Sequence, residues 1–498
     1  MAHQAGTSAT GSRRSWFRAT AAPGPSPVCP EGRCNPRAVP RVHQGMDAAL
    51  AEPAWPYCGA GTDPSAGGPF GCRGRSVDPY TACLAHLTDE QLETHLAGLG
   101  PGSDLDHRGT VLDEDLLNRL LAPLVVTVRR LRSVRVGRAD FRAATFKGVV
   151  RFDSAVFHGD ALFDSAAFHD EAFFGSATFK RDARFGSAVF ARDVRFRSTA
   201  FQRFARFGSV VFGSGVGFRS ATFAREARFD SAAFDGPAHF DSAAFSSVAD
   251  FESAVFSSGA RFDSVAFTRA AWFRSATFDG MADFGRARFD GGASFGSAAF
   301  HAHGSFAQAV FEDTADFENA AFHDVAAFSR AVFRRGSGSR LGPFVCAKKL
   351  SLSSASFEGP VTIDVSARQV VCNGTHWSSA ATMRLRSAGV DLTEAVIDET
   401  LRIAAHRTPF SLHGGGEVDE SLLSGLSPAV RMLSLDGVDA ARLALTDVDI
   451  SGCPPTGVVH MDQLRLEGRR FFVQVRFGMR VREVRRPGRP WRWWPRRR

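Results

Sequence analysis

The chain has 498 residues and a formal net charge of +8, and 44% of its residues are hydrophobic. This apolar share excludes a wholly disordered chain, and no run of 18 apolar residues is present to span a membrane as a helix. Eight cysteines are too few for a disulfide-stapled fold, and the N-terminus has no apolar segment of the secretory type. We therefore expect a cytoplasmic protein with reduced cysteines.

The positive charge is concentrated at the C-terminus. Residues 469–498 contain 12 Arg and one acidic residue, Glu483, whereas residues 139–333 contain 20 basic and 23 acidic residues. Any partner inferred from the overall basicity is therefore a partner of this tail.

The N-terminal residues 1–45 have a low-complexity composition rich in Ala, Gly, Ser, Thr, Pro and Arg. We expect this segment to be disordered, or to precede a translation start at Met46.

A cysteine-containing segment and a helical cap are predicted over residues 46–135. Cys58, Cys72, Cys83 and His86 offer the thiolate and imidazole ligands that zinc prefers, and the spacing from Cys83 to His86 lets one turn present two of them. Cys58 and Cys72 lack the usual two-residue spacing, so free cysteines in a glycine-rich loop are the alternative. The prediction is one structural zinc ion.

Two helices are predicted after this cluster. Thr88 and Gln91 have the spacing of a capping box, and Leu92 and Leu96 follow on one helical face. Leucines between Leu112 and Leu124 form a second apolar stripe. We expect the pair to cover the N-terminal end of the repeat region that follows.

A strict repeat occupies the middle of the chain. From Phe141 to Phe333, Phe recurs at alternating intervals of five and six residues, at 36 positions, and Ala stands two residues before Phe in 29 of them. Residues two apart in an extended segment point to the same side, and the polar residues after each Phe suit turns. The pattern predicts a parallel β-solenoid with a stacked Phe core.

This repeat resembles that of the pentapeptide-repeat proteins, in a branch with Phe at the centre of alternating five- and six-residue units. The resemblance covers residues 139–333 and implies a mainly β fold, a right-handed quadrilateral parallel β-helix with four segments per coil. Four strict pentapeptides would make a shorter coil than the alternating spacing found here. We therefore expect 22-residue coils with a bulged corner at every second turn over residues 136–335.

Beyond Phe333 the Phe spacing ends, but short apolar stretches such as Leu350–Leu352 and Val361–Ile363 continue. We interpret residues 336–468 as an irregular continuation of the solenoid, interrupted by a Gly-rich excursion near Gly414–Gly416.

Outward positions of the repeat carry a second signal. Arg184, Arg206 and Arg228 are spaced by 22 residues, so they should line one edge and bind an anion or an anionic partner. Like charges about 5 Å apart repel by ~0.8 kcal/mol in water. The alternative is a solvated face neutralised by nearby acidic residues, namely Asp182, Asp193 and Glu226.

The function predicted from these features is a non-enzymatic scaffold that presents a rigid surface to a protein partner. The repeat serines are turn residues without a His or Asp partner, and no phosphate-binding glycine loop lies between a strand and a helix. No small-molecule substrate is indicated, and no cofactor besides the zinc.

Two alternatives remain. The tail would bind an anionic membrane surface, peripherally at the inner membrane face, or nucleic acid, through Trp491, Trp493, Trp494, Arg496, Arg497 and Arg498. Some pentapeptide-repeat proteins mimic DNA and modulate type II topoisomerases, but that role requires a strongly acidic solenoid, and this repeat region is nearly neutral.

Overall fold

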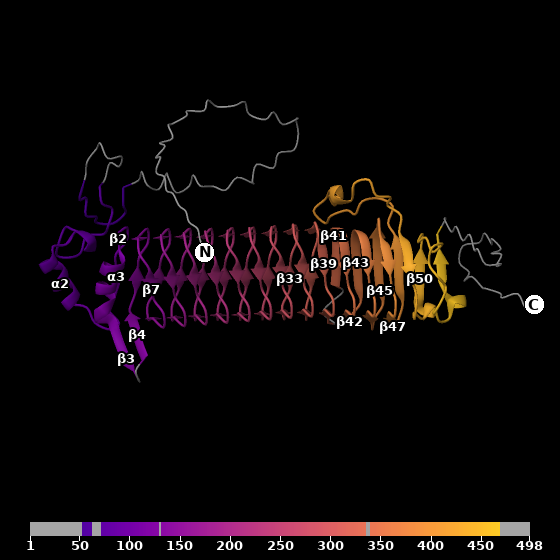
Figure 1. Cartoon of the computed structure of the whole chain (residues 1–498), viewed down its shortest axis with the longest axis horizontal. Coiled ribbons are helices and arrows are strands. Elements are labelled where there is room, and N and C mark those ends of the chain that lie inside the picture. Colours follow the sequence, from indigo (N-terminus) through magenta and orange to yellow (C-terminus); the bar gives the residue numbers. More distant parts are fainter. Residues whose placement is uncertain (1–51, 62–70, 129–130, 335–338, 469–498) are drawn as a thin grey trace, which may run out of the picture. The chain divides into compact units, whose positions relative to one another are not determined.

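The computed structural model of the chain describes residues 52–61, 71–128, 131–334 and 339–468. All of them except Glu52 belong to one compact unit, Pro53–Arg498. This unit is mainly β: it is a parallel β-solenoid of about 15 turns. Within the described residues, its α-helices are α2 (Asp89–Ala97) and α3 (Glu114–Leu121), which lie at the N-terminal end of the coils (Figure 1).

Each regular coil consists of four two-residue strands joined by four corners. In the first complete coil the strands are β5 (Ala139–Asp140), β6 (Thr145–Phe146), β7 (Val150–Arg151) and β8 (Val156–Phe157). Later strands repeat this set at 22-residue intervals as far as β40 (Val332–Phe333), with β39 (Val325–Ala327) one residue longer. Ala167, for example, pairs in parallel with Val189. The predicted 22-residue coil with four segments is therefore confirmed.

The four columns of strands are called faces 1 to 4 here, after β5 to β8. Face 1 is a 10-stranded sheet from β1 to β37, and face 4 belongs to a 14-stranded sheet from β3 to β47. Faces 2 and 3 belong to one 27-stranded sheet, because the long strand β41 (Ser339–Ser351) pairs with β38 on face 2 and with β39 on face 3.

The phenylalanines fill the interior of the coils. All 36 repeat phenylalanines are buried, and the small residues two positions before them are mostly fully buried too. Rings one coil apart stack almost in parallel, as Phe207 and Phe229 do with their centroids 4.9 Å apart. Large rings beside small alanines fill the interior without voids, so the predicted Phe core is confirmed.

Alternate corners have different conformations. The corners that follow faces 1 and 3 contain a residue with positive φ, such as Ser154 at 56° or Ser231 at 56°. In these corners the backbone closes a tight turn, in which Ala155 N–H donates to Phe152 O at 3.0 Å. Corners that follow faces 2 and 4 are one residue shorter. The prediction of a special corner at every second turn is confirmed.

The solenoid starts earlier than the boundary predicted at residue 136. Strands β1 (Leu105–Asp106) and β2 (Val111–Leu112) pair in parallel with β5 and β6 and so form two sides of a preceding coil. Leu112 therefore belongs to a strand and not to the second helix, which is capped by Asp113. The antiparallel hairpin of β3 (Val125–Val128) and β4 (Leu131–Val136) was not predicted.

The helices cover the end of the Phe core as predicted. The capping box of α2 is present, with Thr88 Oγ1 accepting from Gln91 N–H. Leu92 and Leu96 of α2 belong to the same hydrophobic core as Phe141. A short 3-10 helix, η3 (Ala122–Leu124), follows α3.

After Phe333 the strands lengthen. They are β41, β42 (Ser356–Phe357), β43 (Val361–Val371), β44 (His376–Trp377), β45 (Ala381–Arg386), β46 (Gly389–Asp391), β47 (Val396–Ile397), β48 (Leu401–Ala405), β49 (Arg431–Ser434), β50 (Leu443–Thr446) and β51 (Arg465–Glu467). They remain parallel, but the interval from Ser356 to His376 and on to Val396 is two residues shorter than a regular coil. Three 3-10 helices, η4 (Ser421–Leu423), η5 (Ala440–Arg442) and η6 (Met461–Gln463), lie between strands.

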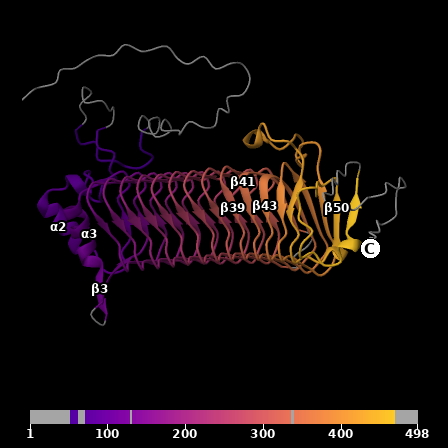
Figure 2. The ribbon, with the colours of Figure 1, turned by 45° about the vertical axis from the view of Figure 1, so that its right-hand side comes forward.

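Residues 406–430 leave the coils and fold beside β41 and β43 (Figure 2). Their side chains form a small separate core of Phe410, Val418 and Leu423 with Val345. In the described ranges, no helix has the length and apolar character needed to cross a membrane.

Candidate functional site

Cys58 and Cys72 are brought together by backbone pairing. Cys58 N–H donates to Gly74 O at 2.8 Å, and Gly59 N–H donates to Cys72 O at 2.9 Å. Gly59 has a φ of 65°, a left-handed conformation that glycine adopts without steric cost. The long interval between the two cysteines, which weakened the sequence motif, is therefore closed by an antiparallel pair.

Cys83 and His86 come from a single turn. The 3-10 helix η2 (Leu84–His86) begins directly after Cys83, and His86 N–H donates to Cys83 O at 2.8 Å. Residues three apart in a 3-10 turn lie on the same side, so the spacing predicted to present two ligands does so.

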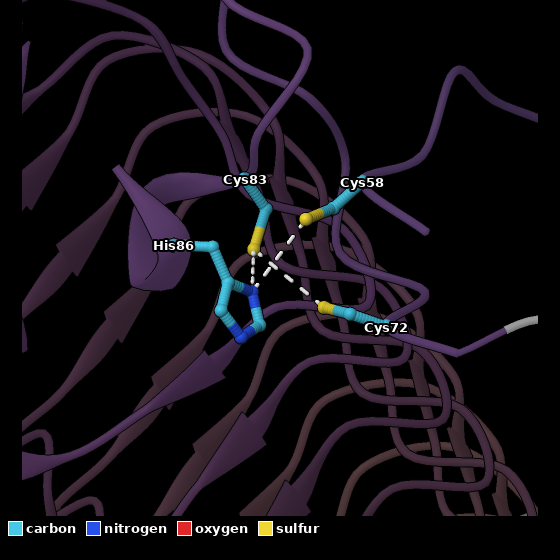
Figure 3. Close-up of side chains that lie close together, drawn as sticks. All are labelled: Cys58, Cys72, Cys83 and His86. Atoms are coloured by element: carbon cyan, nitrogen blue, oxygen red, sulfur yellow. Dashed lines mark hydrogen bonds between the residues drawn. The ribbon is translucent and has the colours of Figure 1, made fainter. Parts of the chain in front are cut away.

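The four side chains point toward one another (Figure 3). His86 Nδ1 lies 3.3 Å from Cys83 Sγ and 3.5 Å from Cys58 Sγ, and the Sγ atoms of Cys72 and Cys83 are 3.6 Å apart. All four ligand atoms lie within 4.8 Å of one another. Zinc bonds of about 2.0 Å to nitrogen and about 2.3 Å to sulfur in a tetrahedron give edges of about 3.5–3.8 Å. The cluster is thus a Cys3His set that could hold a metal.

Hydrogen bonds within the cluster shift the thiol pKa values in opposite directions. The hydrogen bond from Cys83 lowers the pKa of Cys72, and the N–H of Gly74, 3.5 Å from Cys72 Sγ, acts in the same direction. The same contact and burial raise the pKa of Cys83. Gly74 also has no room for a side chain, because a Cβ there would lie 2.8 Å from Cys83 Cβ.

The cluster is attached to the first coil. Arg75 contacts Asp106 of β1 with an Nε to Oδ2 distance of 3.0 Å, and its N–H donates to Arg108 O at 2.8 Å. Trp55 Nε1 donates to Arg73 O at 3.0 Å, and the Arg108 guanidinium lies over the Trp55 ring. A metal bound here would therefore fix the N-terminal segment against the coil that ends the Phe core.

Arg184, Arg206 and Arg228 form the predicted column. They are the second residues of β13 (Ala183–Arg184), β17 (Ala205–Arg206) and β21 (Ala227–Arg228) on face 1, in direct register. Each side chain is at least partly exposed.

The acidic neighbours of this column differ partly from the expected ones. Glu226 contacts Arg228 at 3.1 Å as expected, but Arg184 contacts Asp164 at 3.1 Å instead of Asp182. Asp193 accepts from Ser214 and from Gly215 N–H on another corner. In the described residues, neither Asp182 nor Asp193 has a carboxylate oxygen within 4.0 Å of these arginines, so the neutralising role expected of the two stays a prediction.

A second column was not predicted from the sequence. Arg181, Arg203 and Arg225 stand three residues before the first column, at the corner between faces 4 and 1, and all three are exposed. Between Arg203 and Arg206 lies the half-buried Phe204, and the Arg206 guanidinium is 5.6 Å from its ring centre. The 22-residue period aligns Arg181, Arg203 and Arg225 and places Phe204 among them, so the sequence contains a signal for both the column and the ring.

The residues predicted in the C-terminal tail lie outside the described residues. They are Trp491, Trp493, Trp494, Arg496, Arg497 and Arg498.

Comparison with protein families supports the interpretation of the repeat. A family model described as pentapeptide repeats (9 copies) matches residues 141–189, 152–200 and 262–310. The searches of curated proteins and of solved structures gave no match.

Proposed function

Because the chain is a pentapeptide-repeat protein, we propose that it acts as a non-enzymatic scaffold whose solenoid presents a rigid outer surface to a protein partner. The observation that supports this role is the constant register of the regular coils, in which each strand pairs with its equivalent one coil further. It aligns outward side chains in columns, and the interior is filled by phenylalanine. Such a surface recognises a partner without ordering itself first, which lowers the entropic cost of binding.

The scaffold role predicts a partner whose capture depends on specific columns. We would immobilise the full chain and identify proteins retained from an extract of its source cells. A variant with Arg261→Gln and Arg286→Gln changes face 3 and the adjoining corner, whereas Arg184→Gln and Arg228→Gln change face 1. Loss of one retained protein with one pair and its retention with the other supports the proposal. Identical retention by all variants contradicts it.

We also propose that Cys58, Cys72, Cys83 and His86 hold one structural zinc ion. The support is the donor set itself, three thiols and one imidazole nitrogen whose ligand atoms all lie within 4.8 Å of one another. Structural zinc sites have four protein ligands, and binding contributes directly to folding free energy. The ion would hold the N-terminal segment on the first coil and would supply no catalytic chemistry.

The zinc proposal is tested by elemental analysis of the full chain purified without added metal. We expect about one zinc per chain, loss of zinc in Cys83→Ser, and a lower melting temperature after chelation. Cys453→Ser is a matched control, because this half-buried cysteine lies far along the chain, and it should keep the metal. A wild-type protein without zinc, or equal loss in both variants, would overturn the proposal.

The C-terminal tail provides a second candidate binding region, for anionic membrane surfaces or nucleic acid. Its support is compositional, 12 Arg and three closely spaced Trp within residues 469–498. Deletion of residues 484–498 should abolish most binding to anionic vesicles at low salt. Equal binding by the deleted and full-length chains would move the attraction to the solenoid.

A further inference from the structure

We infer that the corner between faces 4 and 1, with the adjoining outer side of face 1, binds single-stranded nucleic acid over three successive coils. The site is named here the Arg strip and consists of Arg181, Arg184, Arg203, Arg206, Arg225 and Arg228. The inference goes beyond the proposed scaffold function, because it adds a nucleic acid to the protein partner proposed there.

The Arg strip repeats one short motif with sharp limits. Arg-x-Ala-Arg occurs at residues 181–184, 203–206 and 225–228, each time one coil further. The coils before and after it have Gly-Asp-Ala-Leu at 159–162 and Ser-Val-Ala-Asp at 247–250 in the same place. Coils are about 4.8 Å apart, so the strip extends roughly 10 Å along the solenoid.

The guanidinium groups of the strip are mostly available to a ligand. In the part of the chain that the structure describes, no carboxylate oxygen lies within 4.0 Å of the charged nitrogens of Arg181, Arg203 or Arg225. Arg206 contacts the ring of Phe204, and no carboxylate contact is recorded for it in the described residues. Arg184 and Arg228 are partly exposed but paired: Arg184 contacts Asp164, and Arg228 contacts Glu226, Asp230 and Asp250. Four arginines held side by side without a carboxylate in contact, namely Arg181, Arg203, Arg206 and Arg225, favour an anion. Their planar groups bind phosphate oxygens in pairs.

Phe204 favours a nucleic acid over other anions. The corresponding residues of the neighbouring coils are Asp182 and Glu226, so the middle coil replaces a carboxylate by an aromatic ring at the centre of the strip. The ring is half-buried and contacts Arg206. Nucleobases stack on aromatic rings and on guanidinium planes while arginines hold the phosphates.

Other anionic partners fit the strip less well. A membrane surface would extend past the strip and meet Asp230, two residues after Arg228, and Glu252 on the next coil. An acidic peptide would gain nothing from Phe204. A duplex hides its bases from the ring, and reading them requires insertion into a groove. A single strand exposes both its phosphates and its bases, so it can contact the arginines and the Phe204 ring of the Arg strip together.

The test uses the full chain and a fluorescently labelled oligothymidylate of 12 nucleotides, with binding followed by anisotropy over a range of salt concentrations. Arg203→Gln combined with Arg206→Gln should weaken binding at least tenfold and reduce the salt slope by about 1.4, because each single-strand phosphate contact contributes ~0.7. Phe204→Glu, which restores the acidic residue of neighbouring coils, should weaken binding about tenfold or more.

Arg269→Gln is the matched control, because this exposed arginine occupies the same corner column outside the strip. It should bind like the wild type. The arginine pair losing no affinity, or Arg269→Gln losing as much, would overturn the inference. Polyphosphate, polyglutamate or a 12-base-pair duplex that displaced the labelled oligothymidylate as well as an unlabelled single strand does would overturn the single-strand assignment. This outcome would not affect the scaffold proposal, which is tested by the retention experiment. Unchanged melting temperatures would show that every variant is folded.

Discussion

The regular coils of residues 139–333 and the continuation of residues 339–467 both enclose a hydrophobic core, but they differ in strand length, coil length and core residues. The regular coil uses four two-residue strands, and stacked Phe rings fill it. The continuation uses strands of up to 13 residues, its coil is two residues shorter between Ser356 and Val396, and its core mixes Leu, Ile, Val, Met and Trp. The long strands β41 and β43 continue through the corner between faces 2 and 3, and two register shifts between them each shorten the coil by one residue.

The comparison shows where surface function is expected. In the continuation, charged residues also form ion pairs within the chain: Asp364 is fully buried and pairs with Arg340 and Arg384. In the regular coils, most charged side chains lie on corners or on the outward positions of strands, as Arg203 and Arg206 do, where they are available to partners. A fold whose interior is set by one residue type leaves its outer columns free to vary.

The largest effect is expected from a substitution that interrupts the stacked phenylalanine rings of the regular coils. Phe240 stacks on Phe218 and Phe262 with centroid distances of 5.0 and 4.8 Å. Phe240→Ala should lower the unfolding free energy by about 3–5 kcal/mol, because neighbouring rings cannot close the cavity. Urea unfolding measures this, with Ser246→Ala as an exposed control. A loss below about 1 kcal/mol would show that the stack relaxes as easily as a mixed core.

A second prediction concerns the 406–430 excursion, which has no counterpart in the regular coils. Glu420 accepts from Arg386 at 2.6 and 2.9 Å and from Ser366 at 2.5 Å, and the Arg386 side chain is only 8% exposed. Glu420→Gln leaves that guanidinium largely buried without its counter-charge. We expect a cost of about 3 kcal/mol.

The readout is limited proteolysis within residues 406–430. Faster cleavage of Glu420→Gln within this segment, with unchanged cleavage elsewhere, would show that the substitution destabilises the excursion itself. Glu417→Gln, exposed on the same excursion, is the control, and equal cleavage of the two variants would contradict the role given to Glu420.

The difference between the two regions also determines what the sequence could predict. The coil period is visible because each coil repeats the same Phe and Ala, so coil length, core and corner serines followed from the pattern. The Cys3His cluster was predictable in membership, since metal ligands are few. The pairing that closes Cys58 onto Cys72 depends on backbone contacts without a sequence period. The same is true of the contacts of Asp364 and Glu420, whose partners lie tens of residues away.

The N-terminal cap should make stability depend on pH. His107 is 2% exposed, lies between His95 and Phe141, and has no recorded hydrogen bond to its ring nitrogens in the described residues. Burial, together with smaller effects of His95 and Arg75, lowers the pKa of His107 to about 3, although Asp106 opposes the shift. The unfolded chain, with a pKa near 6.5, then binds the proton more strongly, so stability falls as pH falls below that value.

Between pH 7 and pH 5 this histidine should cost about 2 kcal/mol, from about 1.36 kcal/mol per unit. His107→Phe keeps a ring against Phe141 without a titrating group. It should lose that part of the pH dependence, which unfolding curves at both pH values would measure. An unchanged difference between pH 7 and pH 5 would assign the effect to other groups.

The smallest expected effect compares one corner position in the two regions. Ser231 has a φ of 56° in the regular coils, and Gly374 has a φ of 61° at an equivalent turn of the continuation. A left-handed conformation is strained for any residue with a Cβ, whereas glycine has no such strain but loses more chain entropy on folding. Ser231→Gly should therefore change the unfolding free energy by less than about 1 kcal/mol, and Gly374→Ala should lower it by about 1 kcal/mol. Melting temperatures of both variants test this, since only Ser354 Oγ lies within 4 Å of a Cβ at Gly374. If Ser231→Gly were the more damaging change, the serine hydroxyl would have to hold the corner, and the regular coils would then owe part of their stability to the corner as well as to the Phe stack.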